Sequence, residues 1–267
     1  MIHMLQKHLL AFKNAPGIYA MRRRRWDRFF ESRTVGNYFK GVYPNYAAAH
    51  AAIPTSKPVG YDHPEPAAMY RDRAQQVYST DYPVLFWLRP LLRPGLRVFD
   101  LGGHIGVSFY SYSAFLGFPK DIDWLVCDVP AVTRAGVALA REKNRPQISF
   151  TNARADASGR DLLLASGSLQ YIDEHLASIL ARIPDKPAHI MVNLLPVHAE
   201  HEFVTLNSIG VAICPYTIHQ HRRFIESVCA QGYTLIDAWE NPGKQCHIPF
   251  FDAYSTDLYI GAYFRKT

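Results

Sequence analysis

Residues 97–109, RVFDLGGHIGVSF, combine one acidic side chain with three glycines in a spacing that suits ligand binding. A short apolar run ends at Asp100, and the glycines follow before a segment compatible with a helix: Gly102, Gly103 and Gly106. Glycines after a strand let the backbone turn tightly and approach a ligand, and the next helix offers free N–H groups. The stretch therefore predicts a nucleotide-binding turn.

The order of acid and glycines distinguishes this turn from that of a dinucleotide dehydrogenase, in which G-x-G-x-x-G directly follows the strand. Here an acid precedes the first glycine and the glycine spacing differs, which favours a nucleoside that carries a positive charge and no pyrophosphate. A second candidate strand, WLVCDV, ends in Asp128. An acid at the tip of a second strand can accept both hydroxyls of a ribose that lies across the switch point.

Alternating strands and helices must position these residues. From residue 96 onward, short apolar runs are separated by helix-like segments, which predicts a parallel sheet buried on both faces. Because no helix separates the last two strands, we expect a Rossmann-like, seven-stranded, mostly parallel sheet with an antiparallel last strand. The expected strands are 96–101, 122–129, 148–153, 161–166, 188–195, 232–240 and 258–266. The expected helices are 106–117, 130–143, 171–182 and 217–231.

The N-terminal third of the chain differs in composition from the rest. It is rich in Tyr, Arg, Pro and Ala, and its helical patches are broken by NAPG, IPTSKPVG and DHPEP. We therefore expect a helical cap or lid over 1–92 and a cofactor-binding domain over 93–267. The loop 241–257 is expected to complete the lid.

Composition narrows the class of protein. Hydrophobic residues make up 48% and charged residues 19%, as in an ordinary globular chain. There is no signal-peptide pattern, and no apolar run approaches the ~20 residues of a membrane span. The four cysteines form no CxxC pair, so free thiols in a cytoplasmic protein are expected. Much of the net charge of +6 lies in the run Arg22 to Arg25, which we interpret as a solvated helix face.

Together, the two acidic strand ends, the glycines and the antiparallel tail resemble class I S-adenosylmethionine-dependent methyltransferases over residues 96–267. FDLGGHIG is similar to the first motif of that family, VCDVP to its ribose-binding motif, and DLLLASGSLQYI to the fourth-strand motif that faces the methyl group. The likeness is strongest to a family of bacterial proteins described as methyltransferases, with a DxGGxxG / LASGSLQYI pattern, a Pro-Tyr segment (215–216) and a C-terminal GY.L.D.W (232–239).

The resemblance implies S-adenosylmethionine as cofactor and S-adenosylhomocysteine as product. One residue departs from the usual pattern, because many methyltransferases have a glycine where His104 stands. Its side chain would crowd the loop or contact the methionine part of the cofactor, or it would face solvent at the start of a helix. The implied cofactor-binding residues are Asp100, Gly102, Gly103, His104, Gly106, Asp128, Val129 and Ser166.

Methyl transfer from a sulfonium depends on alignment and exclusion of water, although a hydroxyl acceptor generally needs a base. Small-molecule O-methyltransferases carry a histidine after the fourth strand, where this chain has Leu169. Gln170 and Tyr171 remain as polar residues near the methyl path, and Tyr171 equally suits packing. His198, after the fifth strand, is the remaining base candidate, with a surface-loop role as the alternative.

No metal site is expected from the sequence, because the H-x-x-H pair of His198 and His201 has no clear third ligand. The leading hypothesis is methyl transfer to a small-molecule or sugar-like acceptor, without a membrane. A non-catalytic, cofactor-binding relative of the methyltransferases is the alternative. An RNA methyltransferase is disfavoured, because ASGSLQY stands where an Asn/Asp-Pro-Pro-aromatic motif is required. The acceptor and the oligomeric state stay open.

Overall fold

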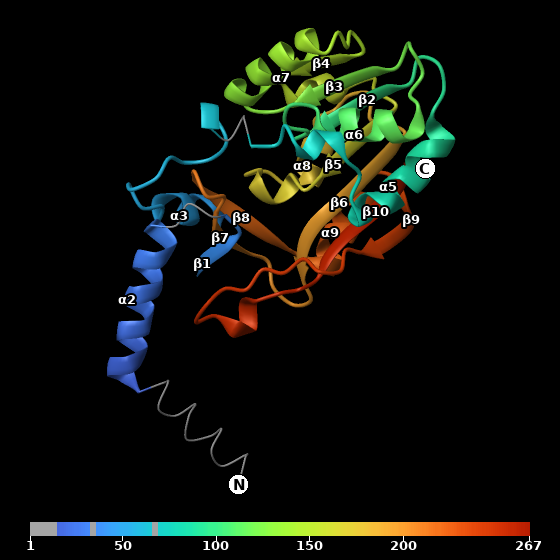
Figure 1. Ribbon diagram of the computed structural model, residues 1–267. Helices are drawn as coiled ribbons and strands as arrows, with labels where there is room; N and C mark the ends of the chain where they lie inside the picture. The colour runs from blue at the N-terminus through green and yellow to red at the C-terminus, as the bar shows by residue number, and fades with distance from the viewer. Residues whose placement is uncertain (1–14, 33–35, 66–68) are drawn as a thin grey trace.

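The structure is a computed structural model that describes residues 15–32, 36–65 and 69–267 (Figure 1). These residues form a mixed α/β fold with helices on both faces of a largely parallel sheet. Short buried strands alternate with helices, and each helical crossover returns the next strand parallel to the last. The Rossmann-like α/β class expected from the sequence is confirmed.

Seven strands form the central sheet in the order β4-β3-β2-β5-β6-β10-β9. β2 to β6 run parallel, whereas β10 is antiparallel to both β6 and β9. The expected seven-stranded arrangement with an antiparallel last strand is therefore confirmed. The strands are β2 Arg97–Leu101, β3 Asp123–Cys127, β4 Ile148–Thr151, β5 Leu162–Ser166, β6 His189–His198, β9 Tyr233–Glu240 and β10 Tyr259–Lys266.

Three strands that the sequence analysis did not predict extend this sheet to ten strands. They pair antiparallel in the order β1-β7-β8, and β8 joins the end of β6 at Val197 and His198. The expected strand 188–195 therefore continues as far as His198, long enough to belong to both parts of the sheet. The three strands are β1 Tyr38–Tyr43, β7 Phe203–Ser208 and β8 Ile213–Gln220.

Two sequence features concealed β7 and β8. Pro215 lies within β8, and proline usually argues against a strand with neighbours on both sides. Polar residues such as Thr205 and Asn207 are buried in β7, so the strand lacks an apolar pattern. The expected helix over 217–231 is wrong at its start, because α9 begins only at His221.

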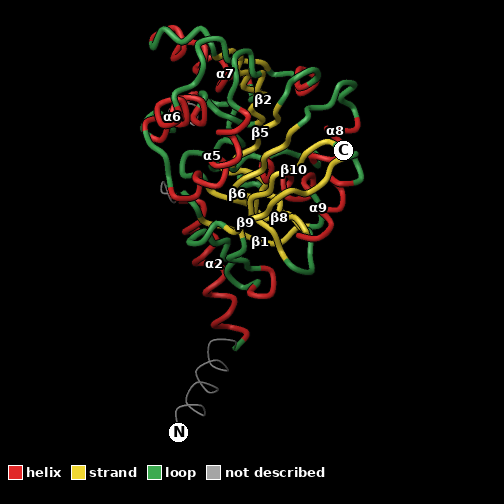
Figure 2. The backbone as a smooth tube through the Cα atoms, turned by 90° about the vertical axis from the view of Figure 1, so that its right-hand side faces the viewer, coloured by secondary structure: helices red, strands yellow, loops and turns green. Residues whose placement is uncertain are grey.

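The helices lie on both sides of the sheet (Figures 1 and 2). Side chains of α5, α6 and α7 pack on one face, and those of α8 and α9 pack on the other. α8 is shorter than the expected helix over 171–182, because a separate 3-10 turn, η5 (Leu169–Tyr171), precedes it. The helices are α2 Pro16–Ser32, α3 Tyr46–Ala51, α5 Tyr82–Leu88, α6 Val107–Leu116, α7 Pro130–Glu142, α8 Leu176–Ala181 and α9 His221–Cys229.

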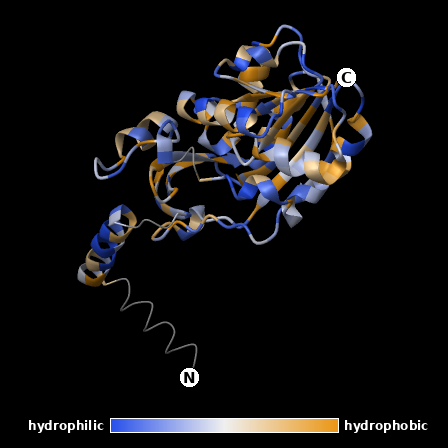
Figure 3. Cartoon of the chain, turned by 45° about the horizontal axis from the view of Figure 1, so that its top comes forward, coloured by the Kyte–Doolittle hydropathy of each residue, from blue (hydrophilic) through white to orange (hydrophobic). Residues whose placement is uncertain are grey.

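The described part of the N-terminal segment is mainly helical, as expected, with β1 as the exception. Its longest helix, α2, reaches out from the sheet and is coloured largely hydrophilic (Figure 3). Arg22 to Arg25 are exposed on it, in agreement with a solvated helix face. None of the helices among the described residues is long and apolar enough to cross a membrane.

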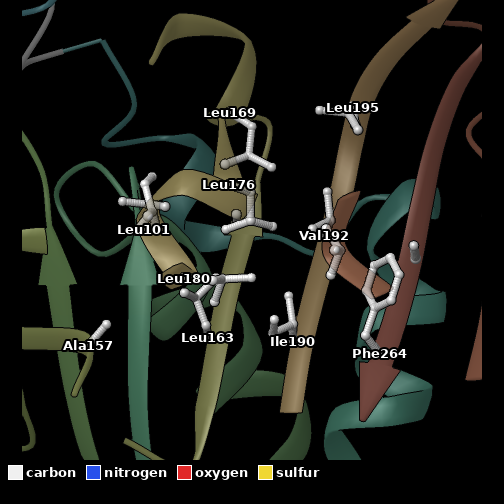
Figure 4. Close-up of a cluster of buried hydrophobic side chains, with 14 of the residues drawn as sticks. Leu101, Ala157, Leu163, Leu169, Leu176, Leu180, Ile190, Val192, Leu195 and Phe264 are labelled. Atoms are coloured by element: carbon white, nitrogen blue, oxygen red, sulfur yellow. The ribbon is translucent and has the colours of Figure 1, made fainter. Parts of the chain in front are cut away.

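Alternate residues of the central strands face opposite layers of the core. In β5, Leu162 and Leu164 pack toward α5, α6 and α7, whereas Leu163 and Ala165 pack toward α8 and α9. Figure 4 shows the second of these layers, in which Leu163 lies beside side chains of α8 and of neighbouring strands. A strand buried on both faces reads as a continuous apolar run, which is why these strands could be recognised in the sequence.

The pairing of β6 with β10 contains a β-bulge. Opposite Gly261, the register shifts so that both Asn193 and Leu194 face one residue of β10. Leu194 has a φ of 54°, in the left-handed region that is strained for a branched side chain. A bulge of this kind bends a strand and re-aims its side chains.

We predict that Gly261→Ala destabilises the protein. A Cβ at this position would lie 2.0 Å from Cε2 of Trp239, and that indole is held by a 3.1 Å hydrogen bond from its Nε1 to Oδ1 of Asn193. Overpacking of this kind costs about 1–3 kcal/mol of unfolding free energy. Urea denaturation should show the loss, whereas the control Gly17→Ala should not, because nothing lies within 4 Å of its added Cβ. Equal stability of the two variants would contradict the prediction.

Candidate functional site

A cavity of about 750 Å³ lies where the carboxyl ends of β2, β3, β5 and β6 meet the N-terminal segment. This edge is where open α/β sheets bind their ligands. Most of the residues singled out from the sequence line the cavity: Gly102, Gly103, His104, Asp128, Val129, Ser166, Gln170 and Tyr171. Three do not line it: Asp100, Gly106 and His198.

The turn after β2 has no room for side chains on its glycines. A Cβ on Gly102 would lie 2.3 Å from Cβ of Ser168, and one on Gly103 would lie 2.3 Å from Cγ of Asp100. Gly106 has a φ of 91° and directly precedes α6. The glycines therefore allow the close approach of η5 and of the Asp100 carboxylate, and they leave the main chain of the turn on the cavity wall.

Asp100 lies behind the turn, with an exposed fraction of 1%. Its Oδ2 accepts a hydrogen bond of 3.0 Å from Nε1 of Trp124, while Oδ1 has no hydrogen-bond partner among the described residues. Burial raises the pKa of Asp100 from 3.8 to about 7, against the opposing effect of the Trp124 hydrogen bond. The carboxyl group of Asp100 packs against the turn at Gly103 and does not line the cavity.

Asp128 lies at the end of β3 and holds the turn in place. Its Oδ2 accepts the backbone N–H of His104 at 2.9 Å, and its Oδ1 accepts the backbone N–H of Val129 at 2.7 Å. Burial raises the pKa of Asp128 to about 6, although both hydrogen bonds oppose the rise. Each carboxylate oxygen has a further lone pair that can accept a hydrogen bond from a ligand.

His104 is buried, with an exposed fraction of 7%, so it does not face solvent. Its φ of 57° lies in the left-handed region that glycine adopts more easily, which explains why a glycine would suit this position. Its ring makes edge contacts with Tyr61 and Tyr70, at centroid distances of 6.1 and 4.6 Å. The imidazole therefore packs between the turn and the N-terminal segment.

Tyrosines form the other wall of the cavity. Tyr171 of η5 donates a 3.1 Å hydrogen bond to Oδ1 of Asn207, and its ring packs edge-on against Tyr61 and Tyr216. Burial raises the pKa of Tyr171 well above 10, so its hydroxyl stays neutral and acts as a donor. The cavity-lining tyrosines are Tyr46, Tyr61, Tyr70, Tyr78, Tyr112, Tyr171, Tyr216 and Tyr259.

Gln170 lies beside Tyr171 in η5 and is buried, with an exposed fraction of 4%. Its Oε1 has no hydrogen-bond partner among the described residues, although Gln170 lines the cavity. A buried amide oxygen without a partner costs free energy. A ligand that donates a hydrogen bond to Oε1 would remove that cost.

His198 has a role in loop structure. Its Nδ1 accepts the backbone N–H groups of Glu200 and His201 at 3.1 and 3.0 Å, and its Nε2 lies 3.1 Å from the carbonyl oxygen of Ala253. With Nδ1 as acceptor, Nε2 carries the proton and donates it to that carbonyl. The structure therefore does not bring this base candidate to the cavity.

Several cavity residues come from segments to which the sequence analysis assigned no individual roles. The segment 36–81 contributes Asp62, Arg73 and Asp81, and the loop 241–257 contributes Lys244. Asp62 also accepts the backbone N–H of Ala131, at the start of α7, over 2.6 Å. No sequence motif identifies these residues, because their position at the cavity depends on how the N-terminal segment crosses the edge of the sheet. The division of the chain at residue 92 stays a prediction.

Comparisons with known proteins bear on the fold. No protein-family model and no curated protein matches the sequence. Among solved structures, the chain matches one from a complex of the Haloferax volcanii Trm112 methyltransferase activator with a candidate methyltransferase. The match has 15% identity and a TM-score of 0.52, and it covers 77% of this chain and 96% of that chain. At this identity the match shows the fold alone, which is a Rossmann-like methyltransferase fold.

Two further structures match below a TM-score of 0.5. The Burkholderia thailandensis 1,6-didemethyltoxoflavin-N1-methyltransferase, with bound 1,6-didemethyltoxoflavin and S-adenosylhomocysteine, has 17% identity and a TM-score of 0.47, covering 75% of this chain and 79% of that chain. The Synechocystis magnesium protoporphyrin IX methyltransferase, with bound S-adenosylmethionine, has 11% identity and a TM-score of 0.48, covering 70% and 78%.

We predict that Asp100→Asn reduces the pH dependence of stability. Because the pKa of Asp100 is raised to about 7, the folded protein retains a proton that the unfolded chain releases near its ordinary pKa of 3.8. This stabilisation is fully present below about pH 4 and is lost as the pH rises to about 7, by up to about 4 kcal/mol. Asparagine mimics the protonated form, so the variant should lack this loss.

Urea denaturation of the ligand-free protein between about pH 4.5 and 7.5 measures the difference. Asp123→Asn is the matched control, because Asp123 lies at the other end of β3, in an ion pair with Arg160 at the surface. It should keep the pH dependence of the wild type. If the unfolding free energy of Asp100→Asn changes with pH as steeply as that of the wild type, Asp100 ionises normally in the folded protein.

Proposed function

We propose that this protein is an S-adenosylmethionine-dependent methyltransferase that acts on a small-molecule or sugar-like acceptor. One observation carries the proposal: in a methyltransferase fold, the glycine turn after β2 and the acid at the end of β3 meet on the wall of one cavity. These are two positions at which the fold can hold a nucleoside with a charged tail. A cytoplasmic, bacterial setting stays a prediction.

The residues present suit this cofactor. The main chain at Gly102 and Gly103 offers close approach, because packing leaves no room there for a side chain. The free lone pairs of the Asp128 carboxylate suit the two ribose hydroxyls. Val129 and Ser166 complete the proposed cofactor side of the cavity, while Asp100 and Gly106 support the turn from outside it.

The acceptor is proposed to lie against the tyrosine wall. When bound, S-adenosylmethionine supplies an electrophilic methyl group on a sulfonium. Tyr171 and Gln170 would orient the acceptor, with the Tyr171 hydroxyl fixed by Asn207 and the Gln170 oxygen open to a donor. The N-terminal segment and the loop 241–257 are proposed to exclude water as a lid, since described residues within 36–81 and residues 243–245 line the cavity.

Positioning, rather than proton abstraction, is the proposed contribution of the protein to the rate. Leu169 is buried where related enzymes carry a histidine, and the phenol of Tyr171 stays neutral. An amine that is already neutral, an acidic hydroxyl or a carboxylate suits such a site, because none of these acceptors demands a strong base. Transfer leaves S-adenosylhomocysteine, and any proton on the acceptor passes to solvent.

We predict that Asp128→Ala weakens binding of S-adenosylhomocysteine about ten-fold or more. A hydrogen bond to a charged group contributes about 1.5–3 kcal/mol, which corresponds to that factor. Isothermal titration calorimetry measures the affinity, with Asp123→Ala at the opposite end of β3 as the control. Equal affinity of wild type and Asp128→Ala would remove Asp128 from the site. Tight binding of NAD without a response to S-adenosylhomocysteine would overturn the cofactor assignment.

We predict that Tyr171→Phe and Gln170→Ala lower turnover by less than about ten-fold, whereas loss of a general base costs about 10²–10⁴. The assay incubates the protein with S-adenosylmethionine and a small-molecule extract, and mass spectrometry detects a product heavier by one CH₂. His198→Ala should match the wild type, because His198 lies outside the cavity. A 10²-fold loss for His198→Ala would contradict the positioning mechanism. Absence of product from the wild type would favour the non-catalytic alternative.

A further inference from the structure

Two histidines and a glutamate from three separate elements converge away from the cavity. His175 caps the start of α8, Glu202 directly precedes β7, and His219 lies in β8. One ligand atom of each lies within 4.8 Å of the other two. Nε2 of His175 is 3.7 Å from Oε1 of Glu202, and Nδ1 of His219 is 3.8 Å from Oε2.

His219 is the unusual member of the group. Its exposed fraction is 3%, and neither ring nitrogen has a hydrogen-bond partner among the described residues. Buried polar groups without partners are rare, because their desolvation is not repaid. Nδ1 lies nearest to Glu202, yet 3.8 Å is too long for a hydrogen bond between them. Within the described residues, the buried imidazole therefore has an acidic neighbour but makes no hydrogen bond.

We propose that His175, Glu202 and His219 bind a divalent transition-metal ion, with Zn²⁺ as the best match. Two imidazoles and one carboxylate form a three-ligand set that zinc accepts, with ligand distances of about 2.0–2.2 Å. The ligand atoms need to approach one another by only about an ångström to reach a common ion. The Glu202 carboxylate would supply negative charge to the ion. The ion in turn would give a ring nitrogen of buried His219 the partner that it lacks among the described residues.

The position of the ion defines its role. None of the three residues lines the cavity, so the ion would not contact a ligand bound there. The ion would instead connect the residues that follow η5 to the β7–β8 hairpin. This connection lies close in sequence to Gln170 and Tyr171, which belong to η5. Because His175 is exposed, solvent can supply the fourth ligand. Because the ion would join these elements outside the cavity, we assign it a role in stabilising the fold, independent of methyl transfer.

The test is Zn²⁺ binding by the full-length protein. After removal of bound metal with a chelator and dialysis, calorimetric titration with ZnCl₂ should show one site per chain, and elemental analysis should return one zinc per chain. His175→Ala and Glu202→Gln should each weaken binding by at least about ten-fold. We use His175→Ala rather than His219→Ala, because His175 is exposed and His219 is buried. Replacement of His175 should therefore leave the fold intact. Circular dichroism checks that each variant is folded.

His201→Ala is the matched control, because His201 stacks on His198 in the neighbouring loop and is not part of the cluster. It should bind Zn²⁺ like the wild type, and the thermal unfolding midpoint of both should rise on addition of Zn²⁺. The His175→Ala midpoint should not rise. Absence of stoichiometric binding to the wild type would overturn the proposal, as would loss of binding in His201→Ala but not in His175→Ala. Neither outcome depends on S-adenosylmethionine binding or turnover.

Discussion

The carboxylate of Asp128 joins the ends of two neighbouring strands, and the shape of the cavity depends on this contact. By accepting the N–H groups of His104 and Val129, it fixes the turn after β2 to the turn after β3. The first of these turns also covers the buried carboxyl group of Asp100, which leaves no space for a Cβ on Gly103. Asp128 thus lies on the cavity wall, whereas Asp100 is buried behind the turn that forms this part of the wall.

A second group of contacts joins β6 to the segments around it. Asn193, in the β6 bulge, donates from Nδ2 to the carbonyl oxygen of Thr80 at 3.0 Å, and its Oδ1 accepts from Trp239 and Asn241 at 3.1 Å each. One side chain therefore links β6 to the N-terminal segment, to β9 and to the loop that follows β9. Because each of these hydrogen bonds ties a different segment to one side chain, Asn193 restricts where those segments can lie.

The added strands contribute side chains to one wall of the cavity. β7 and β8 bring Asn207 and Tyr216 against Tyr171, so this part of the tyrosine wall depends on the strands that join the end of β6. Burial keeps the phenol groups neutral, which gives this wall hydrogen-bond donors and apolar ring surface but no strong base. The same extension brings His219 of β8 beside Glu202, where the sequence offered no metal-binding spacing.

The sequence by itself determined the central sheet and the glycine turn and acidic strand end that line one side of the cavity. Strands that are buried on both faces appear in the sequence as apolar runs. Glycines that follow an acid at a strand end indicate a tight turn of the backbone. Both features can be recognised over a few residues. Only the tertiary structure decided the rest. β7 and β8 carry buried polar residues and a proline that are stabilised by partners far along the chain, and the distance of His198 from the cavity follows from where its loop folds. Contacts of this kind leave no periodicity in the sequence, because the residues that make them are brought together only by folding.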